Sequence, residues 1–271
     1  MQVIGLCRFS YPGFGGFQVH HDKIEDRIAY LYQADRLEER FRLFETVALP
    51  SIREQTDQDF ELVILIGDSL PRHHAQRLSD MVADCKQIRI EAHPPRPHRE
   101  LMKEVLNRSR KDPNAPCLQF RFDDDDAISV DFVERLRKTA DQCSGLLESN
   151  RAVAIDFNRG FVAEFGPHGA AVLPTLRPYF TAALGMYVAG GCKLTIMNFA
   201  HQKIHHHMPS ITLSDAPMWV RTHNGYNDSR QVKAKTFKLE PLTIEQEHEF
   251  QARFALDFDH IRACFDTGVE G

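Results

Sequence analysis

The chain has 271 residues, of which 42% are hydrophobic and 26% are charged, a balance typical of a soluble globular protein. Its formal net charge of −5 gives no general attraction to nucleic acid or to an anionic membrane. The six cysteines are scattered without a C-x-x-C pair, which favours a reduced, cytoplasmic setting.

No membrane-spanning segment is expected from the sequence. No apolar run approaches the roughly 20 residues that a spanning helix requires. The segment 1–8 lacks the basic and apolar regions of a signal peptide and is typical of a strand instead. A peripheral contact with a membrane stays open.

The first half of the chain alternates predicted strands with predicted helices. The strands are expected over residues 3–9, 61–66, 88–92 and 117–122, and the helices over residues 35–54, 71–85 and 99–110. Pro50 is expected to bend or shorten its helix, because proline has no backbone N–H. The alternation predicts an α/β fold with a mostly parallel sheet flanked by helices.

The second half is less regular. Residues 152–157 and 160–165 resemble two paired strands joined by Asn158 and Arg159. Residues 243–265 carry phenylalanines along one side and predict a closing amphipathic helix. We expect one domain over residues 1–271.

Four consecutive aspartates, Asp123 to Asp126, follow the strand predicted at 117–122. Adjacent carboxylates repel one another, and a hard divalent cation would remove that repulsion. Along an extended strand, alternate aspartates would point to opposite sides. The ordinary alternative is a solvated turn, or the start of a helix capped by Ser129.

Three of the predicted strands end in charged residues. Arg8 lies at the end of the first strand, Asp68 follows the second, and the aspartates follow the fourth. In a parallel sheet, ligands bind beyond the carboxyl ends of the strands. We therefore expect these residues to form one site.

The order of these segments resembles a known family. Residues 51–64, the segment Gly67-Asp68-Ser69 and the aspartate run resemble the GT-A glycosyltransferases over roughly residues 1–140. More narrowly, Arg8-Phe9, the aspartate run and Pro217-Met218-Trp219 resemble bacterial proteins named putative rhamnosyltransferases, over most of the chain.

The resemblance implies a GT-A-like, Rossmann-like fold in two parts. About residues 1–140 would bind a nucleotide-sugar, and about residues 141–271 would form an acceptor side. The aspartate run would be the D-x-D element that holds Mn²⁺ or Mg²⁺, and a late histidine would return to the metal. The implied nucleotide-sugar ligands are Arg8, Asp68, Asp123 and Asp124, and the implied metal ligands are Asp125, Asp126 and His223.

Other polar residues allow competing interpretations. Asp215 could act as the catalytic base on an acceptor hydroxyl, although a turn aspartate before Pro217 is the ordinary alternative. His223 could equally be a surface histidine. Trp219 could stack on a sugar ring or pack in the core. A histidine cluster with an i,i+4 pair could bind zinc or form an acceptor-side loop; it comprises His201, His205, His206 and His207.

Sugar transfer from a nucleoside diphosphate requires that the charge of the departing diphosphate be neutralised, which a metal ion can do. We therefore expect a metal-dependent glycosyltransferase with a carbohydrate or lipid-linked acceptor. The narrower resemblance implies rhamnose from dTDP-rhamnose, for polysaccharide biosynthesis. Two alternatives stay open: a metal-dependent hydrolase using the aspartates or the histidine cluster, and a non-catalytic module that binds sugar or Ca²⁺.

Overall fold

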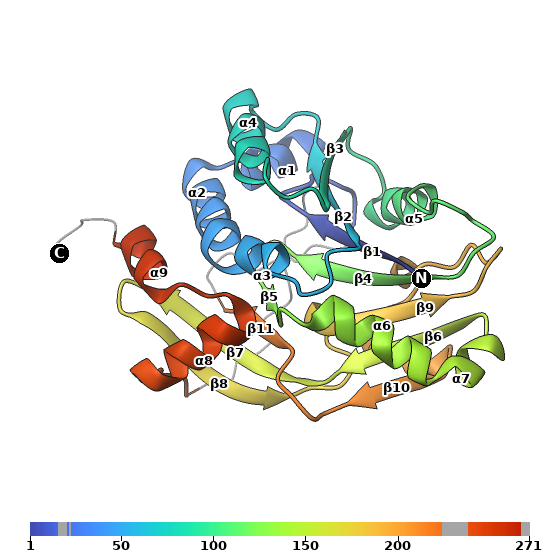
Figure 1. Ribbon diagram of the computed structural model, residues 1–271. Coiled ribbons are helices and arrows are strands. Elements are labelled where there is room, and N and C mark those ends of the chain that lie inside the picture. Colours follow the sequence, from blue (N-terminus) through green and yellow to red (C-terminus); the bar gives the residue numbers. More distant parts are fainter. Residues whose placement is uncertain (16–20, 22, 224–237, 267–271) are drawn as a thin grey trace.

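The computed structural model describes residues 1–15, 21, 23–223 and 238–266 (Figure 1). Its larger sheet has seven strands in the order β10-β6-β9-β4-β1-β2-β3. Every strand pairs in parallel with its neighbour except β9, which is antiparallel to both β4 and β6. The strands are β1 (Gln2–Arg8), β2 (Glu61–Gly67), β3 (Ile88–His93), β4 (Cys117–Asp123), β6 (Ala152–Phe157), β9 (Leu184–Val188) and β10 (Ser210–Leu213).

This arrangement confirms the predicted α/β fold with a mostly parallel sheet. The strands β1 and β2 lie inside the sheet, and every residue between their ends is apolar and buried. Such continuous apolar runs are characteristic of strands covered on both faces.

A second sheet has five strands in the order β12-β8-β7-β11-β5. Its strands are β5 (Ala127–Ile128), β7 (Arg159–Gly166), β8 (Gly169–Leu176), β11 (Trp219–Thr222) and β12 (Glu240–Pro241). The predicted pairing of residues 152–157 with 160–165 is therefore wrong. β6 belongs to the seven-stranded sheet and β7 to the five-stranded one, because the chain passes from one to the other at Asn158.

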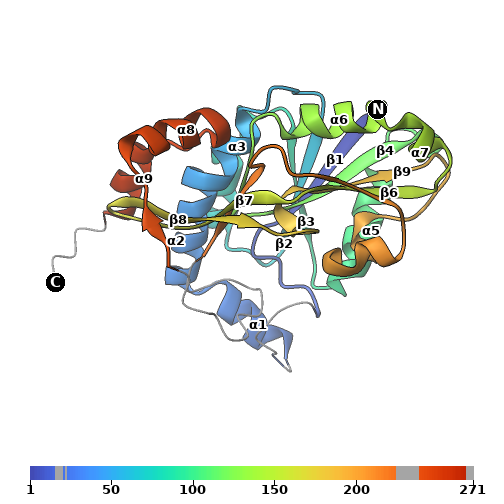
Figure 2. The ribbon, with the colours of Figure 1, turned by 90° about the horizontal axis from the view of Figure 1, so that it is seen from below.

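Helices cover both faces of the seven-stranded sheet, as the two views show (Figures 1 and 2). One face packs against the long helical segment α2 (Ala34–Leu43), η1 (Phe44–Ala48) and α3 (Leu49–Arg53), and against α4 (Arg72–Met81), α6 (Phe132–Gln142) and α7 (Ser144–Glu148). The opposite face packs against α5 (His98–Arg108), η3 (Ile196–Asn198) and η4 (His201–His206). We call these the α6 face and the α5 face. Two further elements are α1 (Ile24–Leu31) and η2 (Thr181–Ala183).

The helix predicted over residues 35–54 is present but contains a π-helical turn. Within η1, the Leu49 N–H bonds to the Phe44 carbonyl, five residues earlier. Pro50 follows immediately and cannot donate a backbone hydrogen bond, so the α-helical ladder is interrupted at this point. The proline thus alters the helix without ending it.

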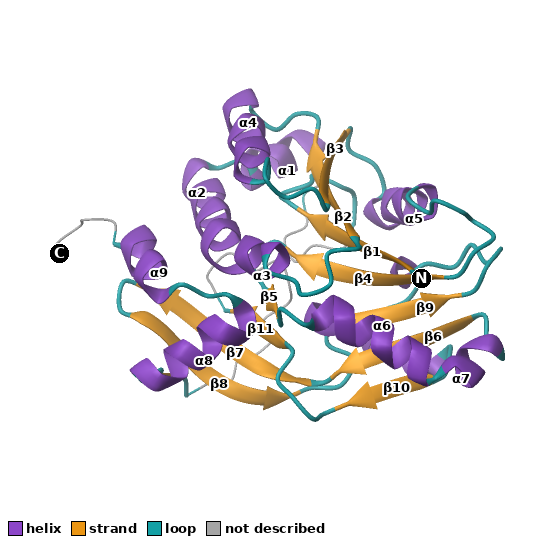
Figure 3. Cartoon of the chain, viewed as in Figure 1, coloured by secondary structure: helices purple, strands orange, loops and turns teal. Residues whose placement is uncertain are grey.

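The closing helix predicted over residues 243–265 is instead two helices, α8 (Ile244–Phe254) and α9 (Phe258–Phe265). They are separated at Ala255, whose backbone is left-handed with φ of 58°. Both helices pack against the five-stranded sheet (Figure 3). The amphipathic side was predicted correctly, but the break was not.

No helix in the described part of the chain is long and apolar enough to cross a membrane. The single domain over residues 1–271 stays a prediction.

Candidate functional site

The aspartate run forms a tight turn at the junction of the two sheets. β4 ends at Asp123, Asp124 and Asp125 form the turn, and the Asp126 N–H donates to the Asp123 carbonyl at 3.3 Å. The run is therefore not an extended strand, and the expected alternation of its side chains is wrong. The turn is needed because the chain must leave the seven-stranded sheet and enter β5 of the other sheet within a few residues.

Arg40 of α2 holds the two aspartates at the tip of the turn. Its guanidinium lies 2.9 Å from Asp124 Oδ1 and 2.8 Å from Asp125 Oδ2. All three side chains are almost completely buried, since none is more than 8% exposed. At these distances the Coulomb attraction opposes the cost of removing the charges from water.

Arg221 of β11 holds the other two aspartates of the run. Its guanidinium lies 3.1 Å from Asp123 Oδ2 and 3.0 Å from Asp126 Oδ2. The Thr222 N–H also donates to Asp126 Oδ1 at 3.1 Å, and the Thr222 hydroxyl donates to the Asp125 carbonyl. β11 is thereby tied to the end of β4.

The two aspartates that share Arg221 have different electrostatic environments. Burial raises the pKa of Asp126 well above its usual range, and the charge of Arg221 only partly opposes this. Burial would also raise the pKa of Asp123, but Arg121 and other nearby arginines lower it overall. Asp123 is the more accessible of the two, with a side chain 28% exposed against 0% for Asp126.

Several arginines surround Asp123, and we call Arg8, Arg99, Arg121 and Arg221 the arginine cluster. Arg8 stands opposite Asp123 in the register of β1 and β4. Burial lowers the pKa of Arg121, and the positive charges of the other three arginines lower it further, whereas Asp123 opposes them. The cluster is thus a place where positive charge is concentrated.

The cluster opens towards the α5 face. Side chains alternate along a strand, and Leu118, Phe120 and Phe122 face the α6 side. Arg121 and Asp123 therefore face α5, whose first turn supplies Arg99. Burial lowers the pKa of the neighbouring His98 to about 4, and Arg8, Arg99 and Arg121 contribute to that shift.

Asp68 lies at the same edge of the sheet, beyond β2. Its N–H donates to the His93 carbonyl at 3.0 Å, and the residue is exposed. Burial raises the pKa of nearby Tyr32 to about 12, with the charge of Asp68 adding to this. Gly67 is required here, because a Cβ atom would lie 2.3 Å from the Tyr32 hydroxyl. Tyr11 completes this corner, donating to the Pro94 carbonyl at 2.7 Å.

Asp215 lies elsewhere in the structure. Its carboxylate is bonded to Arg135 of α6 at 2.6 Å, and this bond is the main reason that its pKa is lowered. The Arg135 guanidinium lies over Phe157, whose side chain belongs to the α6 face. Asp215 is therefore on the side of the sheet opposite Arg121 and Asp123, and its role as a base stays a prediction.

Asp156 is a buried acid whose environment the sequence did not reveal. It lies near the carboxyl end of β6, and it alternates with Val153, Ile155 and Phe157 of the α6 face, so it points towards the α5 face. The residue is 0% exposed, and neither carboxylate oxygen has a well-formed hydrogen bond to a described residue. Burial raises its pKa to about 6 despite the nearby Tyr179 N–H and Thr212 hydroxyl.

The remaining candidates have structural contacts. His223 Nε2 lies 3.8 Å from Glu164 Oε1, and its N–H donates to the Ala163 carbonyl. Trp219 is completely buried and donates to the Phe157 carbonyl at 3.0 Å, so it is a core residue. In the histidine cluster, His201 Nδ1 contacts the Tyr179 carbonyl at 2.6 Å. Ser129 does not cap α6; its hydroxyl bonds to the Asp131 carboxylate.

The predicted Mn²⁺ or Mg²⁺ requires several carboxylate oxygens or other hard ligands facing one point. In the described part of the chain, each aspartate of the run faces an arginine, and the aspartates form no group of three ligand atoms within 4.8 Å. As arranged here, these carboxylates do not fit a cation site.

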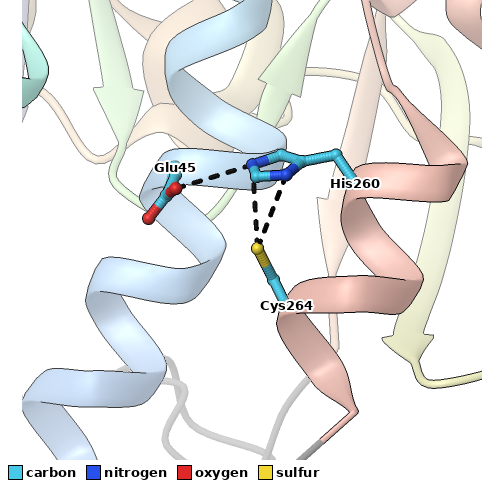
Figure 4. Close-up of side chains that lie close together, drawn as sticks. All are labelled: Glu45, His260 and Cys264. Carbon is cyan, nitrogen blue, oxygen red and sulfur yellow. Dashed lines mark hydrogen bonds and ion pairs between the residues drawn. The ribbon is translucent and has the colours of Figure 1, made fainter.

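One group of three metal-capable side chains does occur among the described residues: Glu45, His260 and Cys264 (Figure 4). His260 Nε2 lies 3.5 Å from Glu45 Oε1, but Cys264 Sγ is 3.7 Å from both ring nitrogens. The contacts join α9 to η1 and include no predicted metal ligand.

Comparison with known proteins gives one match in sequence and several in fold. The model of a family described as "Putative rhamnosyl transferase" matches residues 2–236, most of the chain. No curated protein matches the sequence. S. aureus TarS 1–349 in complex with UDP is similar at 12% identity and a TM-score of 0.46, over 82% of this chain and 61% of that one.

A structure described as a putative nucleotide-diphospho-sugar transferase from Desulfovibrio desulfuricans G20 is similar at 10% identity and a TM-score of 0.37, over 93% of this chain and 95% of that one. The chain spans only 60% of the length of TarS 1–349. With TM-scores below 0.5, these similarities to solved structures carry no argument about activity.

Proposed function

The chain belongs to the family described as putative rhamnosyl transferases, and we propose that it is a glycosyltransferase with a nucleoside-diphosphate-sugar donor. The observation that carries this proposal is the concentration of charged residues at one edge of the sheet. Arg8, Asp68 and Asp123 follow three adjacent parallel strands there. The carboxyl edge of a parallel sheet is the usual location of a nucleotide.

The two ends of this edge differ in chemistry, which suggests an orientation for the donor. The corner of Asp68 and Tyr32 offers an aromatic ring and an exposed carboxylate, which suit a base and the hydroxyls of a ribose. The arginine cluster next to Asp123 suits phosphate oxygens, because guanidinium groups bind them in a bidentate manner. We place the nucleoside at the first and the diphosphate at the second.

The donor sugar proposed is rhamnose, carried by dTDP, because the family description names rhamnosyl transfer. The acceptor proposed is a hydroxyl of a carbohydrate or of a lipid-linked sugar. The arginine cluster would stabilise the negative charge that develops on the departing diphosphate. Asp215 stays the base predicted from the sequence, but it lies on the side of the sheet opposite the arginine cluster and is paired with Arg135, so the proposal gives it no step with a donor bound at that cluster.

The test is incubation of the purified chain with dTDP-rhamnose and other nucleotide-sugars, in parallel with and without Mn²⁺, while nucleotide release is measured. We expect release that depends on an added acceptor and falls at least tenfold in Asp123→Asn. Lack of turnover and of nucleotide binding under all conditions would contradict the proposal. Release that occurs equally without any acceptor would favour the hydrolase alternative.

A further inference from the structure

We infer that the arginine cluster binds the donor diphosphate directly, and that the aspartate run is a structural tie between arginines rather than a cation site. Sugar transfer would then need no added divalent metal. This inference rests on the proposed function and concerns which groups neutralise the diphosphate. Three observations support it.

First, the carboxylates of the run already have cationic partners. Arg40 lies within 2.9 Å of Asp124 and Asp125, and Arg221 lies within 3.1 Å of Asp123 and Asp126. The electrostatic repulsion that suggested a metal is thus relieved by the protein. A cation entering here would have to displace a guanidinium group from carboxylates that are almost completely buried.

Second, several positive charges lie together next to the run, around Asp123. Arg8, Arg99, Arg121 and Arg221 all act on one another or on Asp123. Arg121 forms no hydrogen bond or ion pair with any residue in the described ranges. Like charges held together in a partly buried place are costly, and an anion with several charged oxygens would remove that cost.

Third, the cluster has the geometry of a phosphate site. Arg8 and Arg121 project from neighbouring strands β1 and β4, and Arg99 lies in the first turn of α5, an 11-residue helix. The dipole of a helix favours an anion at its start, where the His98 N–H is already bonded to the Phe14 carbonyl. Strand ends, a helix start and guanidinium groups therefore face one place.

The experiment measures binding of dTDP and of thymidine by calorimetry, using the full chain after treatment with EDTA and again with excess Mn²⁺. We expect dTDP to bind after EDTA treatment, with an affinity that Mn²⁺ changes less than threefold. Thymidine reports on the nucleoside corner alone, so the difference between the two ligands isolates the diphosphate.

The decisive variant is Arg121→Gln, because Arg121 forms no hydrogen bond or ion pair with a described residue, and Asp123, whose charge it attracts, keeps its ion pair with Arg221. We expect dTDP affinity to fall by about tenfold or more, as for the loss of one charge-assisted hydrogen bond, while thymidine affinity is unchanged. Arg72→Gln, an exposed arginine of α4, serves as the matched control and should bind both ligands like the unmodified chain.

The outcomes separate this inference from the proposed function. If dTDP binds only with Mn²⁺, or if Arg121→Gln binds dTDP normally, the inference is wrong but a nucleotide-sugar enzyme remains. If dTDP and thymidine bind under neither condition, the proposed function fails as well. Turnover after EDTA treatment, lost in Arg121→Gln, would support both.

Discussion

At the scale of single residues, Asp156 makes a prediction about pH. Its pKa is raised by burial to about 6 from the ordinary value of 3.8. The folded state therefore binds a proton more readily than the unfolded state between these values, so the free energy of unfolding falls as the pH rises through them. We expect Asp156→Asn to be more stable than the unmodified chain at pH 7.5, by up to about 3 kcal/mol, and the difference to shrink towards pH 4. Urea unfolding at several pH values measures this.

Asp215→Asn is the control, because its effect on stability should change with pH in the opposite direction. The bond to Arg135 lowers the pKa of Asp215, so that carboxylate stabilises the fold above the unfolded pKa and loses its effect as the pH falls. The Asp215→Asn variant should be slightly less stable at pH 7.5 and equal to the unmodified chain in acid. A stability difference for Asp156→Asn that did not vary with pH would contradict the assignment.

The residues of the candidate site were predictable only in part. Arg8, Asp68 and Asp123 could be found because each follows an apolar strand, and parallel strands end at one edge. Arg40 and Arg221 could not be predicted, because they are distant in sequence from the aspartates that they contact. Arg40 lies 84 residues before Asp124, and Arg221 lies 98 residues after Asp123. Nothing local in the sequence says which arginine meets a given carboxylate.

At the scale of elements, the break between α8 and α9 makes a prediction about the backbone. Ala255 adopts a φ of 58°, which costs about 1–2 kcal/mol for a residue with a Cβ atom. Glycine adopts this conformation freely and is the usual residue just beyond a helix. We therefore expect Ala255→Gly to raise the free energy of unfolding by about 1 kcal/mol, measured by urea denaturation.

Ala252→Gly is the matched control, three residues earlier and exposed within α8. It should lower the free energy of unfolding by about 0.5–1 kcal/mol, because glycine is unfavourable inside a helix. If both substitutions destabilised the protein, α8 and α9 would be one continuous helix, as the sequence pattern predicted.

The elements show which patterns in sequence determine structure locally. Buried strands such as β2 were predicted correctly, because a continuous apolar run has few alternatives. The assignment of β6 and β7 to different sheets was not, although only Asn158 separates them. Which sheet a strand joins depends on its pairing partners, and most of these are distant in sequence. β6 pairs with β9 and β10, whereas β7 pairs with β11 and with β8, which follows it directly.

At the scale of the whole molecule, the aspartate turn connects three separate parts of the structure. It leads from the seven-stranded sheet into the five-stranded one, Arg221 reaches it from β11, and Arg40 reaches it from α2. Because the charges are buried and paired, each arginine must lie next to the aspartates that it contacts. A partner that is missing on one side leaves an uncompensated charge on the other.

Arg40→Met tests this connection. The substitution puts an apolar side chain of similar length in place of Arg40. Asp124 and Asp125, which are 8% and 4% exposed, then lose their ion pairs with its guanidinium group. We expect the free energy of unfolding to fall by about 3–5 kcal/mol at neutral pH. Chemical denaturation at neutral pH measures this loss.

Arg42→Met provides the comparison on the same helix. Arg42 pairs with Glu39 at 2.7 Å, but the two side chains are 24% and 19% exposed, so solvent screens the pair and its loss should cost less than about 1 kcal/mol. Adding Asp124→Asn and Asp125→Asn to Arg40→Met should recover much of the stability, since no buried charge is then left unpaired. If Arg40→Met cost no more than Arg42→Met, the aspartates would have another source of positive charge, and a bound cation would be the first to examine.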